Sequence, residues 1–416
     1  MPRMETRKAA CFSIGLMLLV GGPVVLLGGW ILLSWFREIS GPPYGSDGPS
    51  SGWAATWAGD VDGDGIPDLL LGTAFEPAPH ATYGAVRVLS GSDGEVLFLE
   101  SGDRVMARRA GDVNGDGRED VLLDGDRGMR VIDVASGGVL FTATPYSDLD
   151  SFRDPLGDVD GDGCGDLLFR FQSEVQRNRS TLSAISGTSG RVLWSVEGSE
   201  EVLGKRLTRP FGWNTCVIGD VDGDGVSEVA VDATRKSVHV LSGRTGDKLR
   251  ELDLEVYWIL GALLDGGDLD HDGAADVLVH EAEDKPIRAI SCRYGRELWR
   301  IEPPHRPWYV TLSVVGDLDA DGVRDLCADS SAGTWICSGR DGHRLPIRVD
   351  RWLAPGNVDA NRDGHDDLLI TRNVFGAAAR ELGDDVWRAG RVEVLSGVDQ
   401  SALLRLDAEG LSQTPR

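Results

Sequence analysis

A short acidic loop, repeated along the chain, constrains the fold of this protein more than any other feature. In the first copy, Gly59-Asp60-Val61-Asp62-Gly63-Asp64-Gly65-Ile66-Pro67-Asp68, carboxylates occupy loop positions 1, 3, 5 and 9, and glycine occupies position 6. Alternate side chains of a tight loop point inward, so the first three carboxylates can converge, the Ile66 carbonyl can add an oxygen, and Asp68 can close the shell with both of its oxygens. Without a cation, these carboxylates would repel one another strongly. Such a set of hard oxygen ligands indicates Ca²⁺.

The residues after the loop separate it from an EF-hand. An EF-hand loop has twelve residues, ends in a bidentate Glu and lies between helices. Here position 12 is Leu71, within the apolar run Leu69-Leu70-Leu71, which is typical of a buried strand. The pattern therefore predicts a calcium loop between two strands.

The loop recurs along the chain, and we number the seven copies loop 1 to loop 7. Loop 7, in Gly356-Asn357-Val358-Asp359, is offset by two residues but keeps the ligand spacing. The predicted metal ligands at positions 1, 3, 5 and 9 are, in order, Asp60, Asp62, Asp64 and Asp68; Asp112, Asn114, Asp116 and Asp120; Asp158, Asp160, Asp162 and Asp166; Asp220, Asp222, Asp224 and Glu228; Asp268, Asp270, Asp272 and Asp276; Asp317, Asp319, Asp321 and Asp325; Asp359, Asn361, Asp363 and Asp367. Seven units of roughly fifty residues are typical of a β-propeller. We expect up to seven Ca²⁺ ions with a structural role.

Each unit carries a second mark, a predicted hairpin. In the first unit Val86-Arg87-Val88-Leu89-Ser90-Gly91 precedes a glycine-rich turn and the β-rich run Glu95-Val96-Leu97-Phe98. One unit is therefore strand A, calcium loop, strand B, strand C, tight turn and strand D. We predict an all-β fold, a seven-bladed β-propeller of four-stranded antiparallel blades over residues 53–406. The expected blades are 53–101, 102–145, 146–199, 200–254, 255–303, 304–350 and 351–406, followed by a tail at 407–416.

The N-terminal segment predicts one transmembrane helix before the propeller. Residues 1–8 contain Arg3, Arg7 and Lys8, and residues 9–36 are apolar and long enough to cross a bilayer. Basic residues before the span favour a cytoplasmic N-terminus and place the rest outside. The alternative is a cleaved secretory signal, and both readings export the propeller. Residues 37–52, rich in Gly, Pro and Ser, are predicted to be a flexible linker.

Net charge bears on the kind of ligand this protein binds, and cysteine spacing bears on whether it contains a disulfide. The net charge is −25, and seven Ca²⁺ ions would add 14 positive charges and leave −11, so the calcium loops explain much of the acidic excess. This balance argues against nucleic acid as a partner, because phosphate neutralisation needs a basic surface. Cys327 and Cys337 fall on strands B and C of one blade; the spacing allows either a disulfide or two buried thiols.

The repeated D-x-D-x-D-G-x-x-D loop, followed by an apolar strand and a small-residue turn, resembles the FG-GAP repeats of integrin α-subunit propellers. The resemblance covers about residues 53–406. It implies calcium in the A–B loops on one face of the propeller and ligand binding on the opposite face. This chain differs from integrins because all seven units carry the metal loop, and the sequence shows no sign of the leg domains that follow an integrin propeller.

The strand order predicts the same division, since B–C and D–A connections must emerge opposite the A–B loops. These connections carry aromatic and basic residues, and the candidates for ligand binding are Trp213, Arg209, Arg306, Trp308 and Trp387. Such a surface could bind a peptide, an anionic glycan or a wall polymer. The alternative is that the tryptophans near the start of strand A pack between blades.

Two classes of function follow. The first is a membrane-anchored, exported module for protein or glycan binding and cell adhesion, with the propeller at the cell surface or in the periplasm; a periplasmic scaffold of an envelope complex shares this logic. The second is a propeller enzyme, either quinoprotein-like or polysaccharide-acting. Gly190-Arg191-Val192-Leu193-Trp194 and Gly295-Arg296-Glu297-Leu298-Trp299 resemble the turns of quinoprotein propellers, but only these two units carry the tryptophan clearly. The seven blades use nearly all the exported residues, and no nucleophile elbow or HExxH motif is found, so we favour binding over catalysis.

Overall fold

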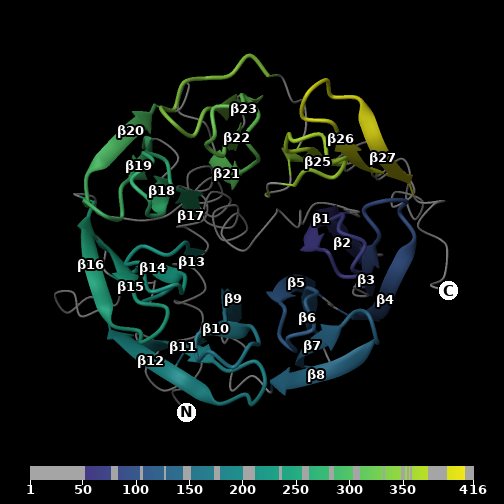
Figure 1. The fold of residues 1–416 in the computed structure, drawn as a ribbon, viewed down its shortest axis with the longest axis horizontal. Coiled ribbons are helices and arrows are strands. Elements are labelled where there is room, and N and C mark those ends of the chain that lie inside the picture. The colour runs from purple at the N-terminus through teal and green to yellow at the C-terminus, as the bar shows by residue number, and fades with distance from the viewer. Residues whose placement is uncertain are drawn as a thin grey trace, which may run out of the picture.

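The computed structural model describes most of the repeat region, with gaps. The described residues are 52–75, 83–103, 106–125, 128–143, 151–172, 179–199, 211–233, 237–254, 262–280, 285–302, 310–330, 333–347, 352–353, 356, 358–372 and 391–407. They form 27 strands in seven antiparallel sheets, arranged around a central axis (Figure 1). The predicted all-β, seven-bladed propeller is confirmed.

Each sheet is built from one contiguous stretch of chain, in the order A-B-C-D. The first four blades are β1 (Gly52–Gly59), β2 (Asp68–Phe75), β3 (Tyr83–Leu89) and β4 (Val96–Asp103); β5 (Met106–Gly111), β6 (Asp120–Asp124), β7 (Met129–Asp133) and β8 (Gly138–Ala143); β9 (Ser151–Gly157), β10 (Asp166–Gln172), β11 (Arg179–Ile185) and β12 (Val192–Ser199); β13 (Thr215–Ile218), β14 (Glu228–Asp232), β15 (Ser237–Leu241) and β16 (Lys248–Asp253).

The last three blades follow the same plan. They are β17 (Ala262–Gly267), β18 (Asp276–His280), β19 (Ile287–Ile290) and β20 (Glu297–Ile301); β21 (Val310–Val314), β22 (Leu326–Ser330) and β23 (Gly333–Cys337); β24 (Trp352–Leu353), β25 (Leu368–Arg372), β26 (Arg391–Leu395) and β27 (Ala402–Asp407). In blade 6 the place of strand D is taken, among the described residues, by a single antiparallel bridge between Cys337 and Arg344.

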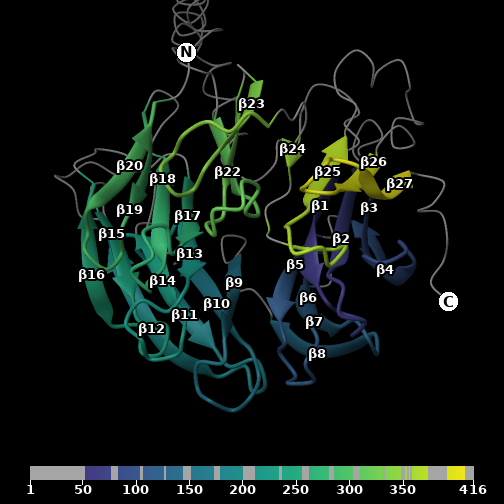
Figure 2. The ribbon, with the colours of Figure 1, turned by 45° about the horizontal axis from the view of Figure 1, so that its top comes forward.

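The A strands lie nearest the axis and the D strands form the rim (Figure 1). Because successive strands run in opposite directions, the A–B loops and the C–D turns emerge on one face, which we call the loop face. The B–C and D–A connections emerge on the opposite face. Figure 2 shows the same ring in an oblique view, turned by 45°.

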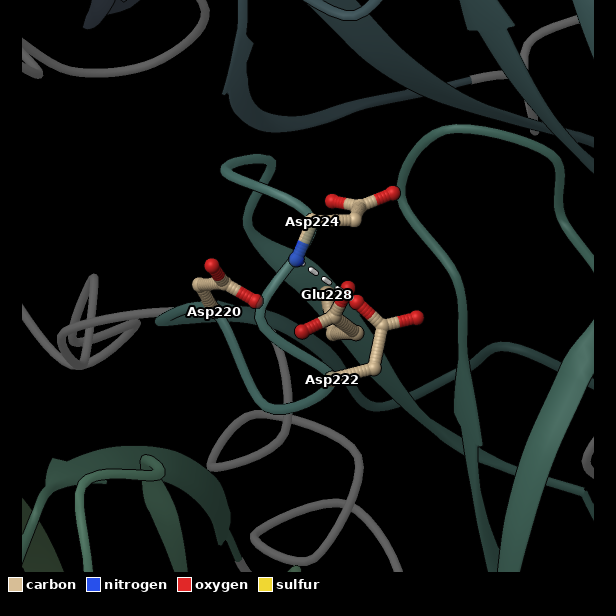
Figure 3. A group of neighbouring side chains, drawn as sticks. All are labelled: Asp220, Asp222, Asp224 and Glu228. Atoms are coloured by element: carbon tan, nitrogen blue, oxygen red, sulfur yellow. Dashed lines mark hydrogen bonds between the residues drawn. The ribbon is translucent and has the colours of Figure 1, made fainter.

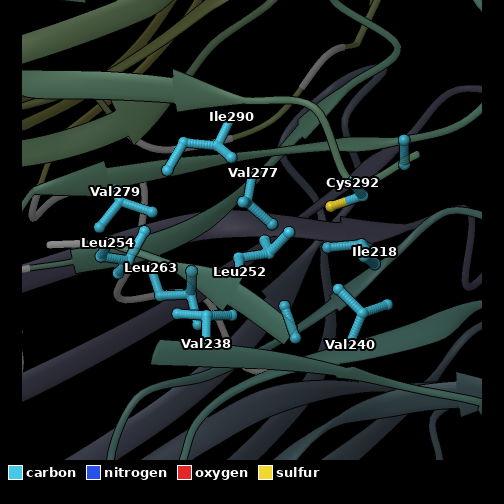
Figure 4. Close-up of a cluster of buried hydrophobic side chains, with 12 residues drawn as sticks. Ile218, Val238, Val240, Leu252, Leu254, Leu263, Val277, Val279, Ile290 and Cys292 are labelled. Carbon is cyan, nitrogen blue, oxygen red and sulfur yellow. The ribbon is translucent and has the colours of Figure 1, made fainter. Parts of the chain in front are cut away.

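The B strands read as continuous apolar runs because both of their faces are buried. Leu69 and Leu71 face blade 7, whereas Leu70 between them faces blade 2. Among the described residues, seven apolar clusters fill the seven interfaces between adjacent blades. Figure 4 shows the one between blades 4 and 5, where Val240 and Leu252 meet Val277 and Ile290. The core is thus a ring of separate interfaces, each built from alternate residues of two blades.

The ring closes without a shared strand. Blade 1 uses only the first strands of the chain and blade 7 only the last, so blades 7 and 1 meet through side chains. Trp57, Leu69 and Leu71 pack there against Leu369 and Val394 of blade 7. On the loop face Arg362 Nη2 of loop 7 donates a hydrogen bond of 2.8 Å to the Asp64 carbonyl of loop 1.

The two tryptophans of the G-R-x-L-W segments tie adjacent blades together. Trp194 Nε1 in blade 3 donates to the Gly243 carbonyl in blade 4 at 2.6 Å, and Trp299 Nε1 in blade 5 donates to the Gly339 carbonyl in blade 6 at 2.8 Å. Both indoles are buried. This contact gives the two tryptophans a structural role between blades.

The register of blade 6 decides between the two possibilities for its cysteines. Cys327 pairs with Ile336 and Leu326 pairs with Cys337, so the two cysteines point to opposite faces of the sheet. Cys327 lies in the cluster facing blade 7, and Cys337 lies in the cluster facing blade 5. Both are free thiols, and the disulfide alternative is wrong.

No helix in the described part of the chain is long and apolar enough to cross a membrane. The predicted span at 9–36, the preceding residues 1–8 and nearly all of the linker lie outside the described residues.

Candidate metal centres

In each loop the backbone folds around the carboxylate at position 1. In loop 1, Asp60 Oδ1 accepts the Gly63 N–H at 2.7 Å and Asp60 Oδ2 accepts the Gly65 N–H at 2.9 Å. These bonds wrap the loop backbone around a carboxylate and require a left-handed residue at position 4. Gly63 meets this requirement, but loops 5, 6 and 7 place His271, Ala320 and Arg362 there, with φ of 58°, 60° and 61°.

The carboxylate at position 9 joins the calcium loop to the C–D turn of the same blade. Asp68 is fully buried; its Oδ2 accepts the Val61 N–H at 2.8 Å, and its Oδ1 accepts the Gly91 N–H at 2.9 Å. This contact explains the Ser-Gly mark of the repeats. A Cβ on Gly91 would lie 1.9 Å from the Pro67 carbonyl oxygen, so the turn reaches the loop only with glycine there. The same pair of bonds recurs at Asp166, Asp325 and Asp367.

Five loops bring three or four of their carboxylates close enough to share one cation, and the position 5 carboxylate belongs to the group only in loop 4. One ligand oxygen from each residue lies within 4.8 Å of the others in these groups: Asp60, Asp62 and Asp68; Asp158, Asp160 and Asp166; Asp220, Asp222, Asp224 and Glu228; Asp268, Asp270 and Asp276; Asp317, Asp319 and Asp325. Figure 3 shows the third group, in which the side chain of Glu228 lies between those of Asp220 and Asp222. Loops 2 and 7 have an amide at position 3, and Asn114 and Asn361 donate to Asp116 at 3.2 Å and to Asp363 at 2.9 Å.

The electrostatics of these groups favour a bound cation. Burial raises the pKa of Asp68 to about 6, although the N–H groups of Gly91 and Val61 oppose the shift. Burial also raises the pKa of Asp120, Glu228, Asp276 and Asp325 to about 7, with further contributions from neighbouring carboxylates. Buried like charges at this spacing are unfavourable unless a cation compensates them.

Buried oxygens that accept no hydrogen bond show more directly whether a cation fits these groups. Glu228 has no exposed surface; its Oε2 accepts the Val221 N–H, while its Oε1 is buried and accepts no hydrogen bond from the described residues. The same is true of Asp270 Oδ1 and Asp272 Oδ2 in loop 5. Buried acceptors without donors match the hard-oxygen ligand set of Ca²⁺, and those of Glu228 and Asp270 lie within groups of further carboxylates. The residues at positions 1, 3, 5 and 9 would hold the ion.

The 28 predicted ligands are all among the described residues, and their role as ligands stays a prediction. The structure adds one feature to position 9: both oxygens of Asp68 already accept backbone hydrogen bonds. Since each carboxylate oxygen has two lone-pair sites, the expected bidentate ligation remains compatible with these bonds.

The sequence analysis missed the third residue of the C–D turn, which faces the calcium loop. Arg244 Nε donates to Asp224 Oδ2 at 2.9 Å, and Thr188 Oγ1 donates to Asp162 Oδ2 at 2.8 Å. Aligning the seven turns would have revealed arginine at this one position in three consecutive blades.

Of the five candidates for ligand binding, only Trp213 lies in the described part of the chain. Arg209, Arg306, Trp308 and Trp387 lie outside it. Trp213 is half-buried, and the guanidinium carbon of Arg170, from β10 of the neighbouring blade, lies 5.6 Å from its ring centroid. Arg170 is itself buried, and its Nε donates to the Phe211 carbonyl at 3.2 Å. Trp213 is therefore packed between blades 3 and 4, at the face opposite the loops.

The family comparison matches the first repeat. The model of the FG-GAP repeat matches residues 51–89, which contain loop 1 and strands β1 to β3. The first repeat of this seven-bladed β-propeller is therefore similar to the FG-GAP repeat.

Two of the solved structures that this chain matches are distant from it in sequence. The crystal structure of BBS1N in complex with ARL6DN, soaked with lead, has 11% sequence identity and a TM-score of 0.47, covering 78% of this chain and 89% of that chain. The structure of BamB from Moraxella catarrhalis has 14% identity and a TM-score of 0.41, covering 80% of this chain and 86% of that chain. The search of curated proteins found no match.

Proposed function

We propose that this FG-GAP propeller is an exported, membrane-anchored calcium-binding module, in which Ca²⁺ stabilises the loop face and the opposite face binds a protein or glycan ligand. Residues 9–36 would anchor it, with the propeller at the cell surface or in the periplasm. The role we propose is adhesion or recognition rather than catalysis, and nucleic acid is not the expected ligand.

The observation that carries the calcium part is the orphaned Oε1 of Glu228 within a group of four carboxylates. Calcium would act structurally, because the position 9 carboxylate connects the A–B loop to the C–D turn of its own blade. An ion held by positions 1, 3, 5 and 9 would therefore fix two connections of one blade at once.

Support for the ligand part is the division of the propeller into two unlike faces. The acidic loops lie together on one face, whereas the described part of the opposite face carries the half-buried Trp213, which packs against the buried Arg170. Aromatic and cationic side chains on a rigid scaffold are typical of sites for peptides and anionic glycans.

Thermal unfolding of the chain in calcium and in chelator tests the calcium part. A ligand that binds only the folded state raises the melting temperature by mass action, so calcium should raise it and chelator should lower it. Asp62→Ala, which removes a ligand of loop 1, should reduce the calcium-dependent increase. Equal melting temperatures in both buffers would contradict calcium binding, and magnesium at the same concentration controls for ionic strength.

A binding screen of the calcium-loaded chain against glycans and envelope proteins tests the ligand part. Any ligand found should bind variants of Arg306 or Trp387 more weakly than it binds a variant of the loop face such as Ser92→Ala. A ligand lost only on substitution of the loop face would contradict the assignment of faces.

A further inference from the structure

The seven C–D turns share one backbone geometry, so their third residues occupy equivalent places. In each turn the N–H of the fifth residue donates to the carbonyl of the first, at 2.8 or 2.9 Å. The position 9 carboxylate of most blades also bonds the second residue, which holds the turn against the calcium loop. The third residues, from blade 1 to blade 7, are Ser92, Ala135, Thr188, Arg244, Arg293, Arg340 and Val398.

In blades 4, 5 and 6 this third residue is an arginine beside the position 5 carboxylate. Arg244 Nε donates to Asp224 Oδ2 at 2.9 Å, and Arg244 Nη2 donates to the Asp224 carbonyl at 3.1 Å. Arg340 Nη1 lies 4.0 Å from Asp321 Oδ2. The guanidinium groups thus engage the calcium loops directly.

Loop 5 has two such cations. Arg293 Nη1 donates to the Asp272 carbonyl and lies 3.9 Å from Asp272 Oδ1. Arg296, which follows the turn glycine, donates through Nη2 to Asp270 Oδ2 at 3.2 Å. Two positive charges therefore face the four carboxylates of this loop.

Loop 3 has no arginine at the equivalent place in its turn. It has the same four carboxylates, but its third turn residue is Thr188, whose hydroxyl donates to Asp162 Oδ2 at 2.8 Å. Arg191 follows the turn glycine as Arg296 does in blade 5, yet among the described residues it makes no ion pair with loop 3. Loop 1 also has a neutral turn residue, but Arg362 from loop 7 donates to its Asp64 carbonyl.

We propose that the C–D turn arginines of blades 4 to 6 are built-in cations that compete with calcium for their loops. Calcium then fills loop 3 at the lowest concentration and loop 5 at the highest. Calcium affinity follows the net charge of the ligand set, and a guanidinium at a ligand oxygen lowers that charge and must be displaced. The inference rests on the proposed calcium binding and assigns its order around the ring.

Hydrogen–deuterium exchange of the full chain across a calcium titration resolves the loops individually. Peptides that cover loop 3 should gain protection at a lower calcium concentration than peptides that cover loop 5. Arg293→Thr should lower the midpoint for loop 5 by about two- to fivefold, the range expected for one partly exposed ion pair. Thr188→Arg should raise the midpoint for loop 3 by a similar factor.

Three controls make the result specific. Thr188→Val removes the hydroxyl bond without adding charge, and it should move the midpoint for loop 3 less than Thr188→Arg does. Arg191→Thr removes a turn arginine that does not contact its loop, and it should leave the midpoint for loop 3 unchanged. Protection of β6 in the untouched blade 2 reports whether each variant is folded.

Two results would overturn the proposal, and they are distinguishable. Calcium-dependent protection of loops 3 and 5 at one common midpoint, unmoved by the arginine exchanges in folded variants, would refute the competition and leave calcium binding intact. No calcium-dependent protection in any loop would refute both the competition and the proposed calcium function.

Discussion

Replacing Glu228 with glutamine should stabilise the fold in chelator, and calcium should remove that advantage. Glu228 is fully buried; its Oε2 accepts the Val221 N–H, and its Oε1 faces the carboxylates of loop 4 without a donor. Glutamine keeps an acceptor for Val221 and offers an N–H₂ group to those carboxylates. It also removes one of four negative charges.

The magnitude follows from the pKa of the metal-free loop. Burial raises the pKa of Glu228 from 4.5 to about 7. Because the folded pKa lies above the unfolded one, this group costs stability as the pH rises from about 4.5 to about 7, and the full cost applies above that range. The shift corresponds to about 3 kcal/mol. In chelator at pH 8, Glu228→Gln should therefore be more stable than the parent chain by up to this amount.

Calcium should remove that advantage. A site saturated a hundredfold above its dissociation constant adds about 2.7 kcal/mol to the stability of the parent chain. The variant has one charged ligand fewer in loop 4 and should gain less from the same calcium.

Thermal unfolding at pH 8, with calcium and with chelator, measures both effects. The control is Glu302→Gln, which neutralises an exposed carboxylate outside the loops and should behave alike in both buffers. If Glu228→Gln were less stable than the parent chain in chelator, the buried carboxylate would not be a source of repulsion, and our account of loop 4 would be wrong.

Two further predictions concern the backbone of the loops and turns. Gly243→Ala places a Cβ 1.8 Å from the Ser227 carbonyl oxygen and should cost about 1–3 kcal/mol in calcium and in chelator alike, measured by urea unfolding; a neutral result would mean that the turn is not held against the loop. Ala320→Gly should relieve the strain of an alanine in the left-handed conformation, with φ of 60°, and should raise the melting temperature measured by calorimetry. The gain in the free energy of unfolding should be less than about 1 kcal/mol, because glycine also makes the unfolded chain more flexible. A decrease for Ala320→Gly would show that the alanine is not strained, and Gly117→Ala, with φ of 85° and no atom near its Cβ, provides the reverse test.

The loops and the blade count were predictable because both are local patterns that recur. Position 6 glycine, the alternating carboxylates and the apolar run after them lie within about a dozen residues, and repetition distinguishes them from chance. The same holds for the hairpin whose turn begins with Ser90 and Gly91, because contact with Pro67 of the same blade requires that glycine.

The cysteine question shows where spacing stops being informative. Cys327 and Cys337 are near in sequence and on adjacent strands, yet a one-residue difference in register places them on opposite faces of the sheet. Register depends on how the whole blade packs between its neighbours, which the spacing of two residues does not contain.

The sequence by itself determined the repeat, the strand order within a blade and the carboxylate pattern of each loop, because these follow from residues close together in the chain. Only the tertiary structure decided which residues meet between blades and beside the loops. Arg362 reaches Asp64 across the closure of the ring, and Arg244 reaches Asp224 from a turn twenty residues away. Such contacts join different strands or different repeats, so their geometry exists only once the blades have packed around the axis.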